Sequence, residues 1–291
     1  MLPLVYVWPL MFAVGVTGIL VLLAVNLFLG VCLLGAYLML PQTVVDAHIQ
    51  AIVKVLRKVF SVDRIEANLK ETFLIEGGPF APTSIYLWHP HSLSCLTSVI
   101  HTTFLKTISA KLTCHSLFFW IPIIRDVFRV GGGISADYET MRHHLRTESV
   151  VVFPGGTSEI LRDIPSKTIV SGIKTRRGVF RLALKEGVSL VPVLTYGEAE
   201  LFPAIPNPLN QFLYKWFGIA VPLTSMEALR NWMRLSHEPL PPVRTFVGDE
   251  LRVEKNETPT LEDIDALKAR YSAALQTLFD KTAPSGYVLE E

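Results

Sequence analysis

The sequence predicts an α/β fold in which a mixed, mainly parallel sheet is flanked by helices. From residue 84 onward, short apolar runs rich in Val and Ile alternate with amphipathic segments, as is typical of strands covered on both faces. Polar motifs directly follow these runs, and ligands of open α/β sheets gather at the carboxyl ends of strands. The expected strands are 84–88, 149–153, 188–195 and a shorter one at 245–247.

Three helices are expected between and after these strands, at 137–146, 175–186 and 261–279. Gly187 follows the second helix directly and suits the left-handed conformation that often ends a helix. Thr260 and Asp263 have the spacing of a capping box at the start of the third. The buried stripe expected on that helix consists of Ile264, Leu267, Tyr271, Leu275 and Leu278.

The apolar start of the chain predicts a membrane-embedded segment. The whole chain is 50% hydrophobic and 18% charged, yet residues 1–45 contain no Asp, Glu, Lys, Arg or His. Since ~20 apolar residues cross ~30 Å of hydrocarbon, this segment supplies one tilted span or a hairpin of two short spans. A cleaved signal peptide fits less well, because a basic start is missing and the apolar run exceeds ~15 residues.

The rest of the chain divides into two further parts. Residues 46–70 have the pattern of a basic amphipathic helix lying beside the membrane, or equally of a helix that faces the core. The bases within 54–58 indicate a cytosolic location by the positive-inside rule. Residues 71–291 form the main domain. Within it, 202–223 is aromatic and broken by prolines, and is expected to contact lipid, to line an acyl groove or to pack as a surface loop.

Charge and cysteine content argue against two classes of protein. The net charge of +1 gives no long-range attraction to nucleic acid, so we expect no nucleic-acid partner. The three cysteines have no paired spacing, which indicates a reducing compartment and no disulfide framework.

The first candidate site is the block Trp88-His89-Pro90-His91-Ser92, directly after an expected strand. A histidine there can act as a general base near neutral pH, although a structural hydrogen bond is the common role of a single histidine. Zinc is an alternative, but it needs three or four ligands, and the sequence has no H-E-x-x-H motif or cysteine pair. We therefore expect no metal site.

The second candidate site is the block 153–159 (FPGGTSE), which also follows a strand. Gly155 and Gly156 allow the backbone to approach a substrate, and their amides suit an oxyanion or phosphate. Glu159 has two interpretations: a favourable charge in the first turn of a helix, or a carboxylate that orients a histidine.

A third motif, 174–180 (KTRRGVF), places Lys174, Arg176 and Arg177 at an expected helix start. An anionic ligand and a solvated charged surface explain these bases about equally well. The stretch 131–136 matches G-x-G-x-x-A, but the residues before it are too charged for the buried strand that a dinucleotide site needs.

These blocks, in this order, resemble the type-2 diacylglycerol acyltransferase and monoacylglycerol acyltransferase family, which is related to the lysophospholipid and glycerol-phosphate acyltransferases. The HPH block is similar to the family's H-P-H-G, and FPGGTSEIL to its G-G-x-x-E block. Residues 121–135 resemble the Arg-acid and glycine-turn block between them. The most specific match is 174–202, which resembles the R-K-G-F and L-V-P-V…G-E block. The resemblance covers the chain from about residue 84 to its end.

The resemblance implies a glycerol-phosphate-acyltransferase-like fold and an enzyme of the endoplasmic reticulum membrane with its catalytic domain in the cytosol. It implies transfer of a fatty acyl group from acyl-CoA to an acylglycerol hydroxyl, with no cofactor beyond that co-substrate. His91 would be the base, His89 its neighbour and Glu159 the carboxylate partner. A lipid-droplet location and a homo-oligomer stay open.

In the expected mechanism, His91 takes the acceptor's proton during direct transfer, without an acyl-enzyme. Amides of Gly155 and Gly156 would stabilise the oxyanion. The other expected substrate-binding residues are Ser92 and, toward the coenzyme A phosphates, Lys174, Arg176 and Arg177.

Departures from the family pattern bear on the acceptor. Ser92 stands where the H-P-H-G glycine is usual, and the H-x-x-x-x-D dyad of the phospholipid enzymes is absent. Their F-P-E-G-T block reads Phe-Pro-Gly-Gly-Thr here, which favours a neutral acceptor over lysophosphatidate. We expect diacylglycerol, with monoacylglycerol, a fatty alcohol or a sterol as alternatives. A non-catalytic lipid-surface protein and a metal-dependent hydrolase using His89 and His91 are the alternatives from other classes.

Overall fold

The computed structural model describes residues 43–45, 47, 51, 62–78, 83–91, 95–121, 124–160, 167–174, 176–203, 205, 208–220 and 225–290. Almost all of the apolar segment 1–45, and most of the helix expected at 46–70, lie outside these residues. The described part of that region includes α4 (Val62–Thr72). Among the described residues, no helix combines the length and hydropathy needed to cross a bilayer.

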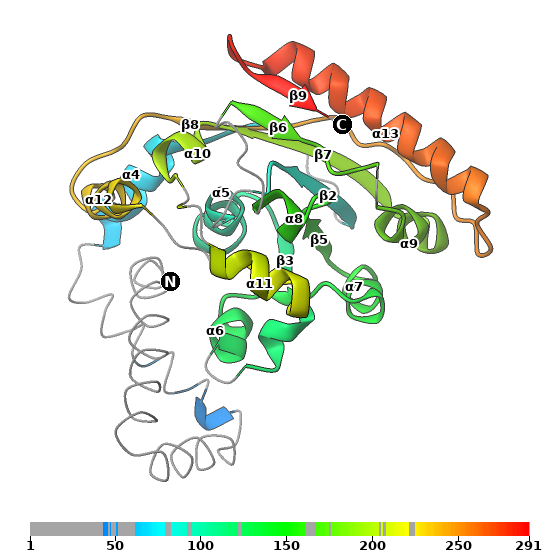
Figure 1. Cartoon of the computed structure of the whole chain (residues 1–291), viewed down its shortest axis with the longest axis horizontal. Helices are drawn as coiled ribbons and strands as arrows, with labels where there is room; N and C mark the ends of the chain where they lie inside the picture. The colour runs from blue at the N-terminus through cyan, green and yellow to red at the C-terminus, as the bar shows by residue number, and fades with distance from the viewer. Residues whose placement is uncertain are drawn as a thin grey trace.

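Seven strands form a mixed sheet, which confirms the predicted α/β fold class (Figure 1). Their order is β1-β8-β7-β2-β5-β3-β4, and neighbours are parallel except for the antiparallel pair β7 and β8. The strands are β1 (Phe73–Gly77), β2 (Ser84–His89), β3 (Ala110–Cys114), β4 (Ile134–Ser135), β5 (Ser149–Val152), β7 (Ser189–Tyr196) and β8 (Val243–Val247). A separate parallel pair consists of β6 (Thr168–Val170) and β9 (Val288–Glu290).

The four strands predicted from apolar runs are all present, as β2, β5, β7 and β8, with ends within two residues of expectation. All of β2 and nearly all of β7 are buried, because both strands lie inside the sheet and are covered on both faces. The apolar runs do not predict β1, β3 or β4. These strands lie nearer the edges of the sheet and are less completely buried.

Helices cover both faces of the sheet. One hydrophobic cluster joins α7, α9 and α13 to Ile85 and Leu87 of β2, and Figure 1 shows α13 lying along the outer side of the sheet. The neighbouring residues Tyr86 and Trp88 belong to a second cluster, as expected for side chains that alternate along a strand. A third cluster joins α4, α5 and α12 to β1 and β8. The central strand β2 is therefore held from both sides.

Helices and short helical turns follow α4 along the rest of the described chain. They are α5 (Leu96–Val99), a π-helical turn continuing it (Ile100–Phe104), a 3₁₀ turn (Ser116–Phe119), α6 (Ile124–Val130), α7 (Tyr138–His144), α8 (Thr157–Ile160), α9 (Gly178–Glu186), α10 (Glu198–Leu201), α11 (Pro208–Phe217), α12 (Met226–Leu235) and α13 (Leu261–Thr282). Because α6 precedes the G-x-G-x-x-A match, no strand leads into it, and the dinucleotide interpretation fails as expected.

The predicted helix ends are largely confirmed. Gly187 ends α9 with φ 66°, in the left-handed region, and Thr260 and Asp263 form the capping box of α13. The stripe expected on α13 is buried in full. α9 begins at Gly178, later than predicted, because Arg176 donates its amide to the Ile173 carbonyl in a preceding turn.

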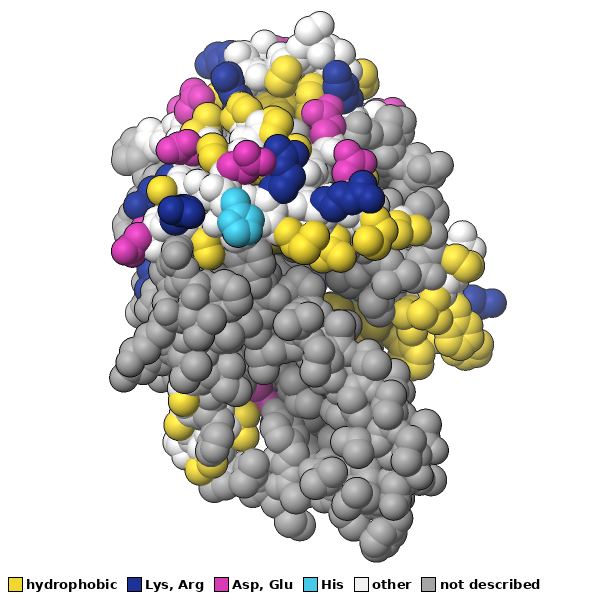
Figure 2. Space-filling view, turned by 90° about the vertical axis from the view of Figure 1, so that its left-hand side faces the viewer, with side chains coloured by type: hydrophobic (Ala, Val, Ile, Leu, Met, Phe, Trp, Pro, Cys, Tyr) yellow, Lys and Arg dark blue, Asp and Glu magenta, His cyan; other side chains and the backbone are white. Residues whose placement is uncertain are grey.

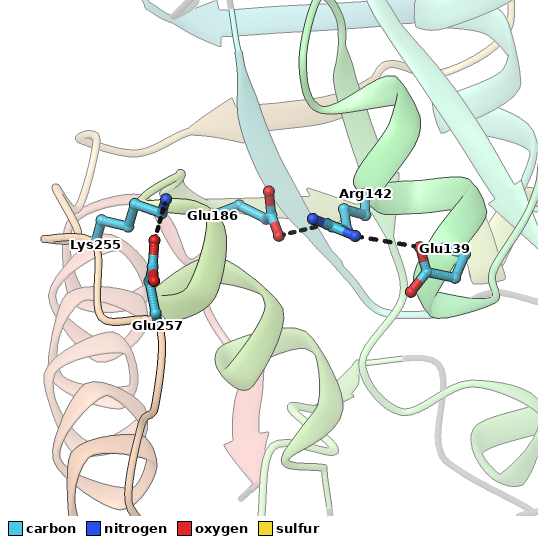
Figure 3. Close-up of polar contacts among 5 residues, drawn as sticks. All are labelled: Glu139, Arg142, Glu186, Lys255 and Glu257. Atoms are coloured by element: carbon cyan, nitrogen blue, oxygen red, sulfur yellow. Dashed lines mark hydrogen bonds and ion pairs between the residues drawn. The ribbon is translucent and has the colours of Figure 1, made fainter.

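Ion pairs add surface links between these helices (Figure 3). Arg142 of α7 contacts Glu139 on its own helix at 3.5 Å and Glu186 at the end of α9 at 2.9 Å. Lys255 and Glu257 pair separately at 2.9 Å. Such partly exposed pairs contribute little to stability, so the apolar cluster beneath them is what holds α7 and α9 to the sheet.

Candidate active site

Two of the predicted motifs, the HPH block and the FPGGTSE block, meet where the parallel strands of the sheet have their carboxyl ends. β2 lies between β7 and β5 and runs parallel to both, so the three strands end on the same side. The residues that follow them there are 90–91 after β2, 153–156 after β5 and 197–198 after β7. This is the edge at which open α/β sheets bind ligands, as the sequence predicts.

His89 is sealed inside the protein beneath α13. Its side chain has no exposed surface, and its Nε2 lies 3.1 Å from the Tyr271 hydroxyl, which donates to the Leu87 carbonyl at 3.3 Å. Because the Tyr271 hydroxyl uses its proton in the hydrogen bond to Leu87, His89 Nε2–H is the donor in the contact between His89 and Tyr271. Burial lowers the pKa of His89 to about 3, against a smaller opposing effect of the Val170 backbone. A neutral, enclosed imidazole suits a structural link better than the catalytic role expected for His89.

His91, two residues on, lies in a different environment. Its ring is only partly buried and packs against Phe153, with ring centroids 4.8 Å apart. The Cys95 sulfur lies 3.7 Å from Nδ1 and 3.9 Å from Nε2 of this ring. The peptide bond between His89 and Pro90 is cis. Of the two histidines, His91 is the one whose side chain a substrate can approach.

Glu159 holds the loop that carries His91. Its carboxylate is buried in the first turn of α8, and Oε2 accepts a hydrogen bond from the His91 backbone amide at 2.6 Å. The sequence-based expectation is contact with the imidazole. The observed hydrogen bond reaches the backbone, so it positions His91 through the main chain. A hydrogen bond to a carboxylate is stronger than one between neutral groups, which suits this function.

The two glycines of the second motif have structural functions that the sequence analysis does not predict. A Cβ at Gly155 would overlap the Glu159 carboxylate, and one at Gly172 would overlap the Gly155 backbone. Gly155 therefore makes room for the carboxylate. The Gly156 amide donates to the Phe153 carbonyl at 3.1 Å and so closes a turn. The sequence-based expectation is that this amide faces an oxyanion, and the structure does not place it so.

The three bases of the predicted cluster, Lys174, Arg176 and Arg177, contact different parts of the protein. Arg176 donates from Nε to the Pro154 carbonyl at 2.9 Å and from Nη2 to the Gly155 carbonyl at 3.1 Å. Arg177 pairs with Asp265 of α13 at 3.3 Å. The exposed Lys174 receives a hydrogen bond at its backbone carbonyl from Lys268. Arg176 thus braces the glycine loop, and binding of coenzyme A phosphates by these bases stays a prediction.

Glu198 belongs to the site although no role was predicted for it. It is buried directly after β7, and its two carboxylate oxygens accept hydrogen bonds from the amides of Leu96, at 3.1 Å, and Thr97, at 3.0 Å. Gly197 beside it has φ 92° and donates its amide to the Tyr287 hydroxyl. The G-E pair within the 174–202 match is the sequence signal that marks Glu198, but Leu96, to which it binds, is 102 positions away along the chain.

Cys95 connects these groups. It precedes α5 with φ 46° and ψ 31°, a left-handed conformation uncommon for a residue other than glycine. Burial raises the pKa of its thiol well above the usual range, and the charges of Glu198 and Glu159 raise it further. The thiol therefore stays protonated, so Cys95 does not have the character of an activated nucleophile.

Ser92 lies outside the described residues, so its expected contact with substrate stays a prediction. Over the described part of the chain, no three or more His, Cys, Asp or Glu side chains form a group that could hold a metal ion.

Comparison with known proteins gives a consistent set of relatives. The family model described as "Diacylglycerol acyltransferase" matches residues 46–287. Diacylglycerol O-acyltransferase 2 of Dictyostelium discoideum is 32% identical over 219 residues, covering 68% of this chain and 65% of the relative. Its counterpart from Xenopus tropicalis is 29% identical over 219 residues, covering 68% and 60%. The chain thus spans less than two thirds of the length of these relatives.

The chain is also similar to a mouse enzyme and, more distantly, to a solved structure. Acyl-CoA wax alcohol acyltransferase 2 of Mus musculus is 32% identical over 218 residues, covering 68% of this chain and 65% of the relative. Among solved structures, the 1-acyl-sn-glycerophosphate acyltransferase of Thermotoga maritima superposes with a TM-score of 0.45 at 15% identity, covering 88% of this chain and 90% of that one.

Proposed function

This chain belongs to the diacylglycerol acyltransferase family, and from that premise we propose that it transfers a fatty acyl group from acyl-CoA to the hydroxyl of a neutral acylglycerol. Diacylglycerol is the expected acceptor and triacylglycerol the product. The observation that carries the proposal is the position of His91, a partly exposed imidazole at the ligand-binding edge of the sheet, on a backbone held by Glu159.

In the proposed reaction, His91 accepts the proton of the acceptor hydroxyl while that oxygen attacks the thioester carbonyl. The new C–O bond forms and the C–S bond breaks. The imidazolium then returns the proton to the coenzyme A thiolate, which leaves as the thiol. Because the thioester itself is the activated acyl donor, this reaction needs no cofactor.

The test is acyl transfer from labelled acyl-CoA in membranes of cells that make no storage lipid. Diacylglycerol, monoacylglycerol, fatty alcohol and lysophosphatidate are supplied in parallel, each with and without a metal chelator. His91→Ala should lower turnover about 10²–10⁴-fold. The matched control is His143→Ala, which removes an exposed histidine of α7 and should leave turnover unchanged.

A neutral-lipid product that disappears only in His91→Ala supports the proposal and names the acceptor. Transfer to lysophosphatidate alone contradicts the neutral acceptor, and chelator-sensitive hydrolysis favours the metal-dependent alternative. No product with any acceptor, from protein that is intact and membrane-bound, contradicts the enzyme proposal. A wax-ester product from fatty alcohol is the second candidate, favoured by the similarity to the mouse wax alcohol acyltransferase.

We further propose that the membrane surface is a partner and that α11 contacts it. Apolar side chains on this helix are open to solvent: Phe212 is 56% exposed and Trp216 66%. The only charged residue in α11 is Lys215. Figure 2 shows a group of hydrophobic side chains projecting at the right-hand side of that view. An aromatic helix with a single base is typical of segments that lie in the headgroup region.

Quenching of tryptophan fluorescence by bromine-labelled phosphatidylcholine tests this contact in vesicles carrying the full chain. Trp216→Phe should reduce the quenched fraction. Trp232→Phe is the control, because Trp232 is buried on α12. Equal quenching in the two variants would remove α11 from the proposed membrane contact.

We propose a location in the endoplasmic reticulum membrane with the main domain in the cytosol, and lipid-droplet surfaces as a second location. The support is the apolar start of the chain together with the bases at 54–58. The sequon Asn256-Glu257-Thr258 provides the test, since a cytosolic domain receives no glycan there. A shift in mobility on treatment with an endoglycosidase would contradict the cytosolic orientation.

A further inference from the structure

We propose that Glu198 is a positioning residue for the acyl transfer described above: its buried carboxylate fixes the start of α5 and thereby the loop from which His91 projects. This inference rests on the proposed function for its kinetic consequence. Its structural part stands on the contacts of Glu198 alone and can be tested without any activity.

Glu198 satisfies the hydrogen-bond donors at the start of α5. The first amides of a helix have no partner within the helix and need an acceptor from elsewhere. Leu96 and Thr97 supply two such amides, both buried, and one Glu198 carboxylate accepts from both. A carboxylate at a helix start is also favoured by the helix dipole. Replacing the carboxylate with a carboxamide turns an NH2 donor toward one of these two amides and leaves that buried amide without its acceptor, which is costly.

Two buried carboxylates, one from each strand beside β2, bind backbone amides near His91. Glu159, after β5, binds the His91 amide, while Glu198, after β7, binds the amides that begin α5. β5 and β7 flank β2 on its two sides. His91 and the first residues of α5 are therefore each held by a buried carboxylate, from the two strands adjacent to β2.

Cys95 contacts the His91 ring and is close enough to Glu198 to be affected by its charge. Its backbone begins α5 and its sulfur lies within 4 Å of the His91 ring, so a displaced helix start also displaces this thiol. The negative charge of Glu198 contributes to the raised pKa of Cys95. Removal of that charge lowers this pKa and loosens the loop, and both changes make the thiol more reactive.

The experiment compares Glu198→Gln, which keeps the shape but offers one acceptor oxygen, with Glu200→Gln, which makes the same change at an exposed position of α10. Both are measured in the full chain in membranes. We expect Glu198→Gln to lower kcat about 10–100-fold, with the KM for acyl-CoA within about two-fold, because the misplaced base affects the chemical step. Glu198→Asp keeps both acceptor oxygens and should give an intermediate kcat.

The second readout is alkylation of Cys95 by iodoacetamide, followed by mass spectrometry of the peptide. We expect alkylation to be at least about three-fold faster in Glu198→Gln than in the wild type or in Glu200→Gln. Cys114 is the internal reference, since it lies on β3 and should react at the same rate in every variant.

A lower kcat with unchanged KM and faster Cys95 alkylation supports the positioning role. An unchanged kcat and an unchanged alkylation rate overturn it. Faster reaction of Cys95 and Cys114 together also overturns it, because that result indicates general loosening of the fold. If Glu198→Gln does not accumulate, Glu198→Asp decides on the same two readouts. If the wild type transfers no acyl group, the proposed function fails, and the ratio of Cys95 to Cys114 labelling still decides whether Glu198 braces the loop.

Discussion

The two histidines of one motif lie two residues apart and have opposite surroundings. His89 is enclosed between β2 and α13 and bound to Tyr271, whereas His91 stands past the end of the strand beside Phe153 and Cys95. The pleat of the strand directs the His89 side chain into the core, and β2 ends there, so that His91 lies beyond the end of the strand. His89 links the strand to the last long helix, whereas His91 lies beyond the end of the strand, where we propose that it acts as the base. Variants can separate these two roles.

The largest expected effect is on the enclosed side. His89→Ala creates a cavity and removes the group that donates to the Tyr271 hydroxyl, so the free energy of unfolding should fall by about 2–5 kcal/mol. His143→Ala, on the surface, should change stability very little. Chemical unfolding in detergent followed by circular dichroism measures both. Equal midpoints for the two variants would mean that His89 has no structural role.

The comparison can also be sharpened by pH. Burial lowers the pKa of His89 to about 3 and that of His101 to about 4, while both groups titrate near 6.5 in the unfolded chain. Below pH 6.5 the unfolded state therefore binds more protons than the folded one. The stabilisation is complete above about 6.5 and is lost toward pH 4, at up to about 1.4 kcal/mol per pH unit for each histidine.

Unfolding midpoints at pH 7, 6 and 5 test this dependence, with His101→Asn as the comparison. The variant should lose part of the pH slope even where its absolute stability is lower. A slope identical to that of the wild type would contradict the assignment of His101 as a group that is neutral in the fold.

A smaller loss of stability is expected when Tyr271, the partner of His89 on α13, is changed. Tyr271→Phe keeps the ring but removes the hydroxyl, so the buried His89 Nε2–H loses its acceptor at a cost of about 1–3 kcal/mol. Turnover per folded molecule should stay within a few-fold of the wild type, because His91 is not touched. Tyr214→Phe on the exposed α11 is the control. A collapse of kcat without loss of stability would assign Tyr271 to the chemistry instead.

The smallest effect is expected at the start of α13. Thr260→Ala removes one half of the capping box and should cost about 1 kcal/mol, without any change in kcat. Thr258→Ala, also exposed and two residues earlier, is the control for loss of a threonine. Thermal unfolding of the two variants, measured side by side, should place Thr260→Ala lower. Equal melting temperatures would indicate that packing alone holds the start of this helix.

Local patterns predict the features that depend on neighbouring residues. The capping box, the end of α9 at Gly187 and the strands β2, β5, β7 and β8 depend on spacing within about ten residues, and the structure confirms them. The helix α11 is not predicted, because prolines surround it and its apolar residues are not covered by the core.

The site shows why the rest is harder to predict. Glycines at 155 and 156 suggest contact with a ligand, yet one makes room for Glu159 and the other closes a turn. The residues next to Glu198 in the sequence do not indicate its partners, because Leu96 and Thr97 are about 100 positions away. Its role depends on which strands become neighbours, and that arrangement is set by packing over the whole sheet.

The contact between His89 and Tyr271 also orders events during synthesis. The two residues are 182 positions apart, so at ~5–20 residues per second a ribosome needs roughly 10–40 s to pass from one to the other. During that interval the sheet face later covered by α13 stays open, and the nascent chain is most exposed to aggregation. The end of β2 cannot reach its final geometry until α13 has emerged. A stalled or truncated product lacking this helix is therefore expected to be both inactive and a target for degradation.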